Sequence, residues 1–224
     1  MGVRVPRWLI LTGVGVVFMV AGLGYIGYSL AFGGDDDDKF TGDAQLSDKA
    51  VPFTAGPYSG RIEPEWFSTY LVLQDATTSR PAGNRGLAIR RIVENFFNQP
   101  SVTHVFYVFF EDNEDFSASM NILRCEPPGA AEITSSTENL LKFYQENNIK
   151  AESVGTATYN STNYDILKVD LTEGYDTHIV ALKTGDCITP ATLVSKKDDR
   201  QMVENFRAVL SELVIDPAQM PKLD

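Results

Sequence analysis

The sequence predicts an α+β protein, in which an N-terminal transmembrane helix precedes one extracytoplasmic antiparallel-sheet domain covered by helices. Residues 8–32 form a run of 25 residues without Asp, Glu, Lys, Arg or His, which is long enough to cross a hydrocarbon core of about 30 Å as a helix. Residues 151–195 contain four β-rich segments joined by short, turn-like connections, a pattern typical of an antiparallel meander. Apolar residues with helical spacing occur on both sides of that meander.

The basic residues next to the apolar run predict its orientation. Arg4 and Arg7 precede the run, and an excess of basic residues marks the cytoplasmic side. We therefore expect a cytoplasmic N-terminus and residues 33–224 in the periplasm, a lumen or the cell exterior. A cleaved signal peptide is the alternative, because Ser29-Leu30-Ala31 offers small residues at a cleavage site. The run is longer than the 7–15 apolar residues usual in a signal peptide, which favours a retained anchor.

Small residues within the apolar run predict a contact surface. They recur at spacings of three and four, at Ala21, Gly24, Gly27 and Ala31. Such a stripe lets two helix backbones approach closely in lipid. The alternative is that glycine is simply common in membrane helices. We expect helix packing against an integral membrane protein complex.

Composition divides the chain into segments and excludes one class of partner. The predicted segments are a cytoplasmic N-terminus (1–7), the transmembrane helix (8–32), a linker (33–61), an α+β domain (62–215) and a tail (216–224). The linker contains Asp35–Lys39, which spells the enteropeptidase recognition sequence and is treated as a solvated run of charge. The net charge of −11 disfavours binding to nucleic acid.

The chain has two cysteines, Cys125 and Cys187, and both fall at predicted strand ends next to turns. In an extracytoplasmic domain they are expected to form a disulfide. Two buried free thiols are the alternative.

The domain elements follow from local patterns. Strands are predicted over residues 66–73, 102–110, 116–122, 151–159, 164–171, 178–183 and 187–195, and helices over 87–97, from Ser135 to about 147, and from Asp198 or Asp199 to about 213. Ser135 and Glu138 have the spacing of a capping box. The sheet must be covered by these helices.

Few residues are candidates for chemistry. His104 and His178 are the only histidines, and neither has a metal-ligand spacing, so each is expected to be structural. The acidic cluster 111–115 lacks the spacing of a calcium loop and is expected to be a solvated turn. Asn160 begins a glycosylation sequon in a predicted turn. No catalytic residue, cofactor site or metal site is predicted.

Residues 116–215 resemble the PsbP-like α/β/α sandwich family in the order of their elements. The resemblance rests on the strand FSASMNILR, the helix SSTENLLKFYQENN, the meander from AESVGTATY to ITPATLVSK and the closing helix RQMVENFRAVLSELVI. The helix over 87–97 and the strand over 102–110 depart from what is expected near the family's N-terminal part. The resemblance implies a non-catalytic accessory or binding domain and assigns no site residue.

These observations lead to the hypothesis of a non-catalytic, membrane-anchored accessory subunit or assembly factor of a larger complex, such as a respiratory or photosynthetic one. The alternative hypotheses are an anchored module that binds a solute or cation, and an anchored hydrolase. The hydrolase would need His104 or His178 beside an acid or nucleophile in a cleft.

Overall fold

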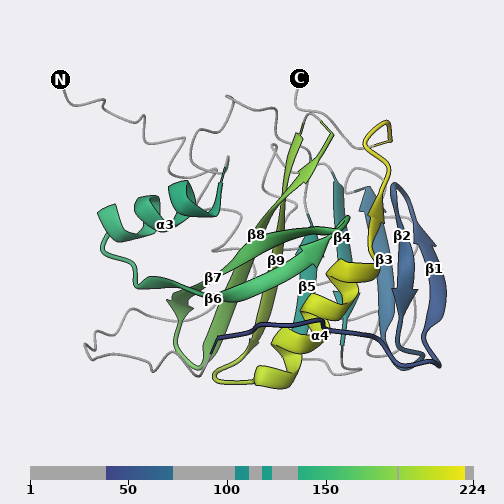
Figure 1. The fold of residues 1–224 in the computed structure, drawn as a ribbon, viewed down its shortest axis with the longest axis horizontal. Helices are drawn as coiled ribbons and strands as arrows, with labels where there is room; N and C mark the ends of the chain where they lie inside the picture. The colour runs from purple at the N-terminus through teal and green to yellow at the C-terminus, as the bar shows by residue number, and fades with distance from the viewer. Residues whose placement is uncertain (1–38, 73–103, 111–117, 123–135, 186, 220–224) are drawn as a thin grey trace.

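The computed structural model describes residues 39–72, 104–110, 118–122, 136–185 and 187–219 (Figure 1). Within these ranges strands predominate, and the elements are β1 (Val51–Ala55), β2 (Tyr58–Ile62), β3 (Phe67–Val72), β4 (His104–Phe109), β5 (Ala118–Ile122), α3 (Thr137–Glu146), β6 (Ala151–Tyr159), β7 (Thr162–Thr172), β8 (Tyr175–Thr184), β9 (Cys187–Lys196), α4 (Arg200–Glu212) and β10 (Val214–Ile215).

The larger sheet is antiparallel and has seven strands in the order β3-β4-β5-β9-β8-β7-β6. The hairpin between β6 and β7 turns at Asn160 and Ser161, whose φ angles of 47° and 60° match the two-residue turn that suits twisted strands. The four-strand meander predicted over residues 151–195 is therefore confirmed.

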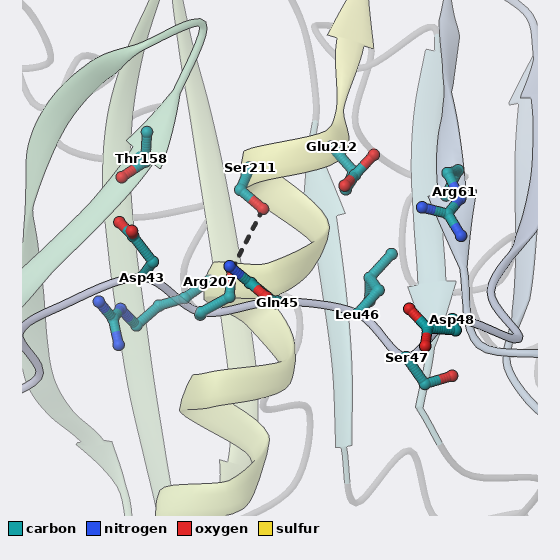
Figure 2. Close-up of a pocket in the computed structure, with 11 residues that line it drawn as sticks. Asp43, Gln45, Leu46, Ser47, Asp48, Arg61, Thr158, Arg207, Ser211 and Glu212 are labelled. Carbon is teal, nitrogen blue, oxygen red and sulfur yellow. Dashed lines mark hydrogen bonds between the residues drawn. The ribbon is translucent and has the colours of Figure 1, made fainter.

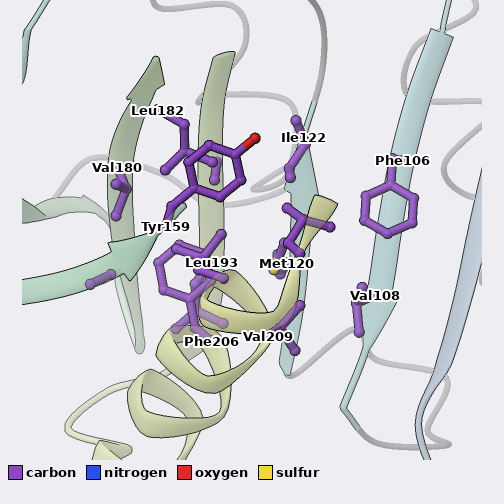
Figure 3. Packing of buried hydrophobic residues seen from close by; sticks show 14 of the residues in the cluster. Phe106, Val108, Met120, Ile122, Tyr159, Val180, Leu182, Leu193, Phe206 and Val209 are labelled. Atoms are coloured by element: carbon purple, nitrogen blue, oxygen red, sulfur yellow. The ribbon is translucent and has the colours of Figure 1, made fainter. Parts of the chain in front are cut away.

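Each face of this sheet has its own apolar cluster, because alternate residues of a strand point to opposite faces. On one face α4 contributes Phe206 and Val209, which pack with Val180 and Leu182 of β8 (Figure 3). On the other face Leu140 and Tyr144 of α3 pack against a second cluster that includes Ile179 and Ala181 of the same strand. The sheet thus lies between two helices, and both are amphipathic.

A smaller sheet, with the order β1-β2-β10, packs beside β3 and β4. Tyr58 of β2 is fully buried and stacks on Phe106 of β4, with ring centroids 4.4 Å apart. Ile215 of β10 pairs with Tyr58, so the chain immediately after α4 returns to a strand near the start of the described residues.

Residues 39–50, which we call the strap, run across α4 (Figure 1). Phe40 forms a single parallel bridge with Gly155 at the outer edge of β6, where the register of β6 shifts. A glycine is required there, because φ is 145° and a Cβ would lie 2.6 Å from the backbone nitrogen of Phe40.

The predicted α+β fold class is wrong for the described residues, which are mostly β-structure with two helices. Residues 51–62 were expected to belong mainly to a linker, but they form β1 and β2. These strands are short and contain Pro52 and Gly60, so their hydrophobic pattern was too weak to indicate strands. The α3 cap also differs by one residue, because the hydroxyl of Ser136 accepts the hydrogen bond from the N–H of Asn139.

The predicted single-pass membrane localisation is overturned by the helices that the structure describes. The two helices have 10 and 13 residues, and none in residues 39–219, apart from the undescribed gaps, is long and apolar enough to cross a bilayer. The predicted span 8–32 and its small-residue stripe (Ala21, Gly24, Gly27 and Ala31) lie outside the described residues. The predicted extracytoplasmic location of the domain depended on that span and falls with the single-pass localisation.

The predicted disulfide is also corrected, because none joins the residues that the structure describes. Cys125 lies outside them, and Cys187 is the first residue of β9, where its backbone pairs with Thr184 of β8. The helix predicted over 87–97 and the acidic cluster 111–115 likewise lie outside the described residues.

Candidate functional site

Two hollows lie beside α4, one on each side of the place where the strap crosses it. The first, the strap groove, runs between strap residues 43–48 and the C-terminal half of α4 (Figure 2). The second, the His178 pocket, lies near the start of α4 and has a volume of about 400 Å³.

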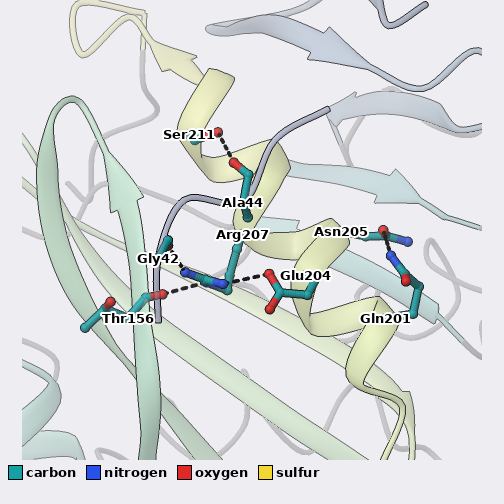
Figure 4. Close-up of polar contacts among 8 residues, drawn as sticks. All are labelled: Gly42, Ala44, Thr156, Gln201, Glu204, Asn205, Arg207 and Ser211. Atoms are coloured by element: carbon teal, nitrogen blue, oxygen red, sulfur yellow. Dashed lines mark hydrogen bonds and ion pairs between the residues drawn. The ribbon is translucent and has the colours of Figure 1, made fainter. Parts of the chain in front are cut away.

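The polar groups of the strap groove hold the strap in place. Arg207 of α4 is only 4% exposed. Its Nε donates to the carbonyl oxygen of Thr156 at 2.7 Å, one terminal nitrogen pairs with Glu204 at 2.6 Å, and the other donates to the carbonyl oxygen of Gly42 (Figure 4). Ser211 donates to the carbonyl oxygen of Ala44 one turn further along the helix. The three contacts of Arg207 use all of its guanidinium nitrogens, and together with Ser211 they join the strap to α4. We therefore interpret the strap groove as a structural joint.

The far end of the strap is fixed to the smaller sheet. The N–H and the hydroxyl of Ser47 both donate to the carboxylate of Glu63, at 2.6 and 2.5 Å. These hydrogen bonds lower the pKa of Glu63 because they stabilise its charged form. The strap is therefore held at both ends and along its length.

The His178 pocket is built from five parts of the chain. Asp176 and His178 come from β8, and Lys168 is the cross-strand partner of His178 on β7. The remaining walls come from β6, the start of the strap, and the turn before α4 with the first turn of that helix. The residues are Glu152, Ser153, Val154, Lys39, Phe40, Asp198, Asp199, Arg200 and Val203. The pocket thus interrupts the apolar face of the sheet with charge at the end nearest the start of α4.

An ion-pair network occupies one side of the pocket. Lys168 Nζ lies 3.0 Å from Asp176 Oδ2 and 3.6 Å from Asp198 Oδ1. Asp176 Oδ2 also accepts the backbone N–H of Asp198 at 2.8 Å, which fixes the turn before α4. Burial alone would lower the pKa of Lys168, but the hydrogen bond and charge of Asp176, together with the charge of Asp198, raise it above its ordinary value.

Three buried polar atoms at this end of the sheet have no hydrogen-bond partner among the described residues. They are Asp176 Oδ1, His178 Nδ1 and Ser195 Oγ, from side chains 2%, 3% and 0% exposed. Asp176 and His178 line the pocket, and Ser195 is the cross-strand partner of Asp176 on β9. An unsatisfied buried polar group costs about 1–3 kcal/mol, so a pair of them at a cavity calls for an explanation.

His178 is neutral near pH 7. Its pKa is lowered to about 4, mainly by burial; the Asp176 carboxylate partly opposes this shift, and the nearby Lys168 charge adds to it. A neutral imidazole leaves one ring nitrogen able to accept a hydrogen bond. The residues that line the pocket therefore include two with an atom left unpaired among the described residues, a carboxylate oxygen of Asp176 and a ring nitrogen of His178, two positions apart on one strand.

The arrangement lacks the hydrogen bonds of a nucleophile and base. Neither His178 Nδ1 nor Ser195 Oγ has a hydrogen-bond partner in the described parts of the chain, so these atoms form no Ser-His or His-Asp link. A metal centre is not assembled either, because no three His, Cys, Asp or Glu side chains among the described residues are grouped to hold an ion.

The histidines predicted as structural have separate positions. His178 lies in the pocket, whereas His104 is the first residue of β4 and pairs with Val72 of β3. Sequence reasoning missed the pocket, although a signal was present. Asp176 and His178 occupy the same alternating positions of β8 as the buried Val180 and Leu182, and polar residues at core positions of a strand indicate a special site.

Comparisons with known proteins do not assign a family. No family model matches the chain, and no curated protein matches it. Solved structures with some similarity include a protein from Bacteroides thetaiotaomicron (11% identity, TM-score 0.39, 75% of this chain and 48% of that one). This chain therefore spans about half the length of that protein. A cyanobacterial PsbP from Synechocystis has 10% identity and a TM-score of 0.39, over 79% of this chain and 98% of that one.

A third structure is the immunity protein TplEi of Pseudomonas aeruginosa in complex with a peptide, with 9% identity and a TM-score of 0.41, over 76% of this chain and 99% of that one. The match to PsbP is a weak resemblance at the level of the fold, with nothing at the level of the family. At these scores none of the three indicates what this chain does.

Proposed function

We propose that this chain is a non-catalytic binding domain that holds a small polar ligand in the His178 pocket. The observation that carries the proposal is that two buried atoms without a hydrogen-bond partner among the described residues, Asp176 Oδ1 and His178 Nδ1, belong to side chains that line a cavity of about 400 Å³. Binding sites for small molecules have volumes of about 300–1,000 Å³ and a few convergent polar groups. A ligand that donates hydrogen bonds to these atoms would remove the cost of burying them unpaired.

The surroundings of the pocket suit binding better than catalysis. Lys168 is held by two carboxylates, and the turn before α4 is held by the backbone hydrogen bond to Asp176. Such fixed groups are preorganised, which reduces the entropy that a ligand must lose on binding. The alternative of a hydrolase would need a nucleophile paired with a base. Neither Ser195 Oγ nor His178 Nδ1 has a hydrogen-bond partner among the described residues, so these atoms do not support it.

The proposal is tested by NMR titration of the 15N-labelled chain with small amines, alcohols and carboxylates. We expect at least one class to shift the amide resonances of residues 152–154, 168, 176–178 and 198–203 in a saturable manner. Amides of α3, which packs on the opposite face of the sheet, provide the internal control. The absence of saturable shifts around the pocket for all three classes would overturn the proposal.

The role of accessory subunit or assembly factor in a larger complex stays a prediction. It is supported by the acidic net charge of −11, which suits a basic partner surface. Affinity isolation of the full chain from its native cells tests it. A stoichiometric partner would support that role, and isolation of the chain alone would count against it.

A further inference from the structure

We infer that the ligand of the His178 pocket is a small organic cation that carries a protonated primary amine. This inference rests on the proposed function and narrows it to one chemical class. It follows from the charges that line the pocket, from the hydrogen-bonding capacity left over in it, and from the chemistry of ammonium groups.

The charges around the pocket leave one negative charge unbalanced. The basic side chains in the lining are Lys39, Lys168 and Arg200, and the acidic ones are Glu152, Asp176, Asp198 and Asp199. Four carboxylates against three basic groups give a net charge of −1, since His178 is neutral. The positive end of the α4 dipole lies nearby, but Asp199 caps that helix by accepting the N–H of Met202 at 3.3 Å. A ligand with one positive charge near these side chains would make the pocket neutral.

Among the described residues, the pocket lining holds an unsatisfied acceptor on Asp176 and an unsatisfied ring nitrogen on His178. Asp176 keeps one carboxylate oxygen unpaired after binding Lys168 and the N–H of Asp198. His178 Nδ1 accepts a hydrogen bond when the ring carries its single proton on Nε2. Lys168 is engaged by carboxylates, and the guanidinium of Arg200 lies over the ring of Phe40 at 4.6 Å. An anionic ligand would therefore meet surplus acceptors and negative charge.

The geometry suits a group with several donors on one atom. Asp176 and His178 are two residues apart on the same face of β8, so their Cα atoms are about 7 Å apart and both side chains border the same pocket. A primary ammonium has three N–H donors and reaches acceptors on different sides at once. Glu152 stands directly across from Lys168 in the β6–β7 register and adds a carboxylate at the rim. A hydrogen bond between an ammonium and a buried carboxylate is charge-assisted and hence among the stronger kinds.

Three probes with the same four-carbon chain separate the possible ligand classes. They are the monocationic 4-amino-1-butanol, the neutral 1,4-butanediol and the dianionic succinate, each titrated calorimetrically into the full chain at pH 7 and low salt. We expect 4-amino-1-butanol to bind at least tenfold more tightly than either of the others. If butanediol or succinate binds this pocket as well or better, the cation inference is overturned and the proposed function stands. If none of the three binds, both fail.

Variants then locate the binding site. Asp176→Asn should weaken 4-amino-1-butanol binding by about tenfold or more, and Glu152→Gln, at an exposed rim position, by about threefold. Glu146→Gln on α3 removes one exposed acidic charge from the other face of the sheet and should leave binding unchanged. Asp176→Asn also removes the ion pair with Lys168, so unfolding of the chain would abolish binding in this variant for an unrelated reason. Glu152→Gln changes an exposed side chain and tests the site without that complication. Equal effects of Glu152→Gln and Glu146→Gln would show only general attraction to an acidic protein and would overturn the inference.

Discussion

Phe40 and Gly155 form a single parallel bridge in which the backbone of the strap joins the edge of the larger sheet. The N–H of Phe40 donates to the carbonyl oxygen of Val154 at 2.8 Å, and its carbonyl oxygen accepts the N–H of Thr156 at 3.0 Å. The side chain of Phe40 is buried and also lines the His178 pocket. The bridge therefore holds one wall of the candidate site.

Gly155→Ala is expected to release the strap. The new Cβ would overlap the Phe40 backbone, in addition to the strain at a φ of 145°. Gly174→Ala is the matched control, because φ is 82° there and no atom lies within 4 Å of the added Cβ. Limited proteolysis should show faster cleavage within residues 39–50 for Gly155→Ala alone, while Gly174→Ala should cost about 1 kcal/mol from backbone strain. Equal cleavage of the two variants would show that the bridge does not hold the strap.

Arg207→Met should destabilise the fold by about 3 kcal/mol in urea unfolding. The methionine preserves most of the apolar packing but leaves the carbonyl oxygens of Gly42 and Thr156 without their charged donor. Glu204→Gln removes the ion pair and leaves the two carbonyl hydrogen bonds in place. Because Glu204 is about 40% exposed, this variant should cost less than about 1 kcal/mol of folding stability. A similar loss in both variants would mean that the ion pair, and not the carbonyl contacts, stabilises the joint.

Stability should fall in acid because of His178. Its pKa is about 4 in the folded chain and about 6.5 when unfolded. As the pH falls from about 6.5 towards 4, the unfolded chain takes up a proton that the folded chain does not, so the unfolded state is favoured. Between pH 7.5 and 4.5 this one group should remove about 2.5 kcal/mol of stability. Urea unfolding at the two pH values should show a drop larger by about that amount in the native chain than in His178→Gln, whereas equal drops would mean that His178 titrates normally.

Ser136→Ala should destabilise the chain by about 1 kcal/mol, because the Ser136 hydroxyl accepts the N–H of Asn139 at the start of α3. The sequence pattern instead indicated Ser135 as the capping residue. Thermal unfolding of Ser135→Ala and Ser136→Ala distinguishes the two assignments. A larger loss for Ser135→Ala would contradict the cap observed in the structure.

Local sequence patterns predicted much of the larger sheet, because each strand of the meander carries its own alternation and its own turn. The strand observed at Ala151–Tyr159 has the predicted bounds, and the last helix begins after Asp199, one of the two predicted caps. The smaller sheet was missed because its stability comes from distant partners. Val214 pairs with Ser59, and nothing in the local sequence of either residue indicates the other.

The candidate site was hidden for the same reason. Lys168, Asp176 and Asp198 are separated along the chain, and only the β7–β8 register and the turn before α4 bring them together. His178 was singled out from the sequence and assigned a structural role. The overlooked signal was Asp176, two positions before His178 on the same face of the strand. Two polar residues at alternate core positions of a strand are seldom there for packing alone, so together they indicate a site.

The joint between Arg207 and Gly42 also has a consequence for the order of events during protein synthesis. The two residues are 165 positions apart, so the ribosome makes the strap early and its helix near the end. At about 5–20 residues per second the strap waits roughly 10–30 s before Arg207 is made, and through that interval the carbonyl oxygen of Gly42 lacks the donor that it has in the folded chain. Nascent chains halted before α4 should be cleaved readily within the strap, and full-length chains released from the ribosome should resist.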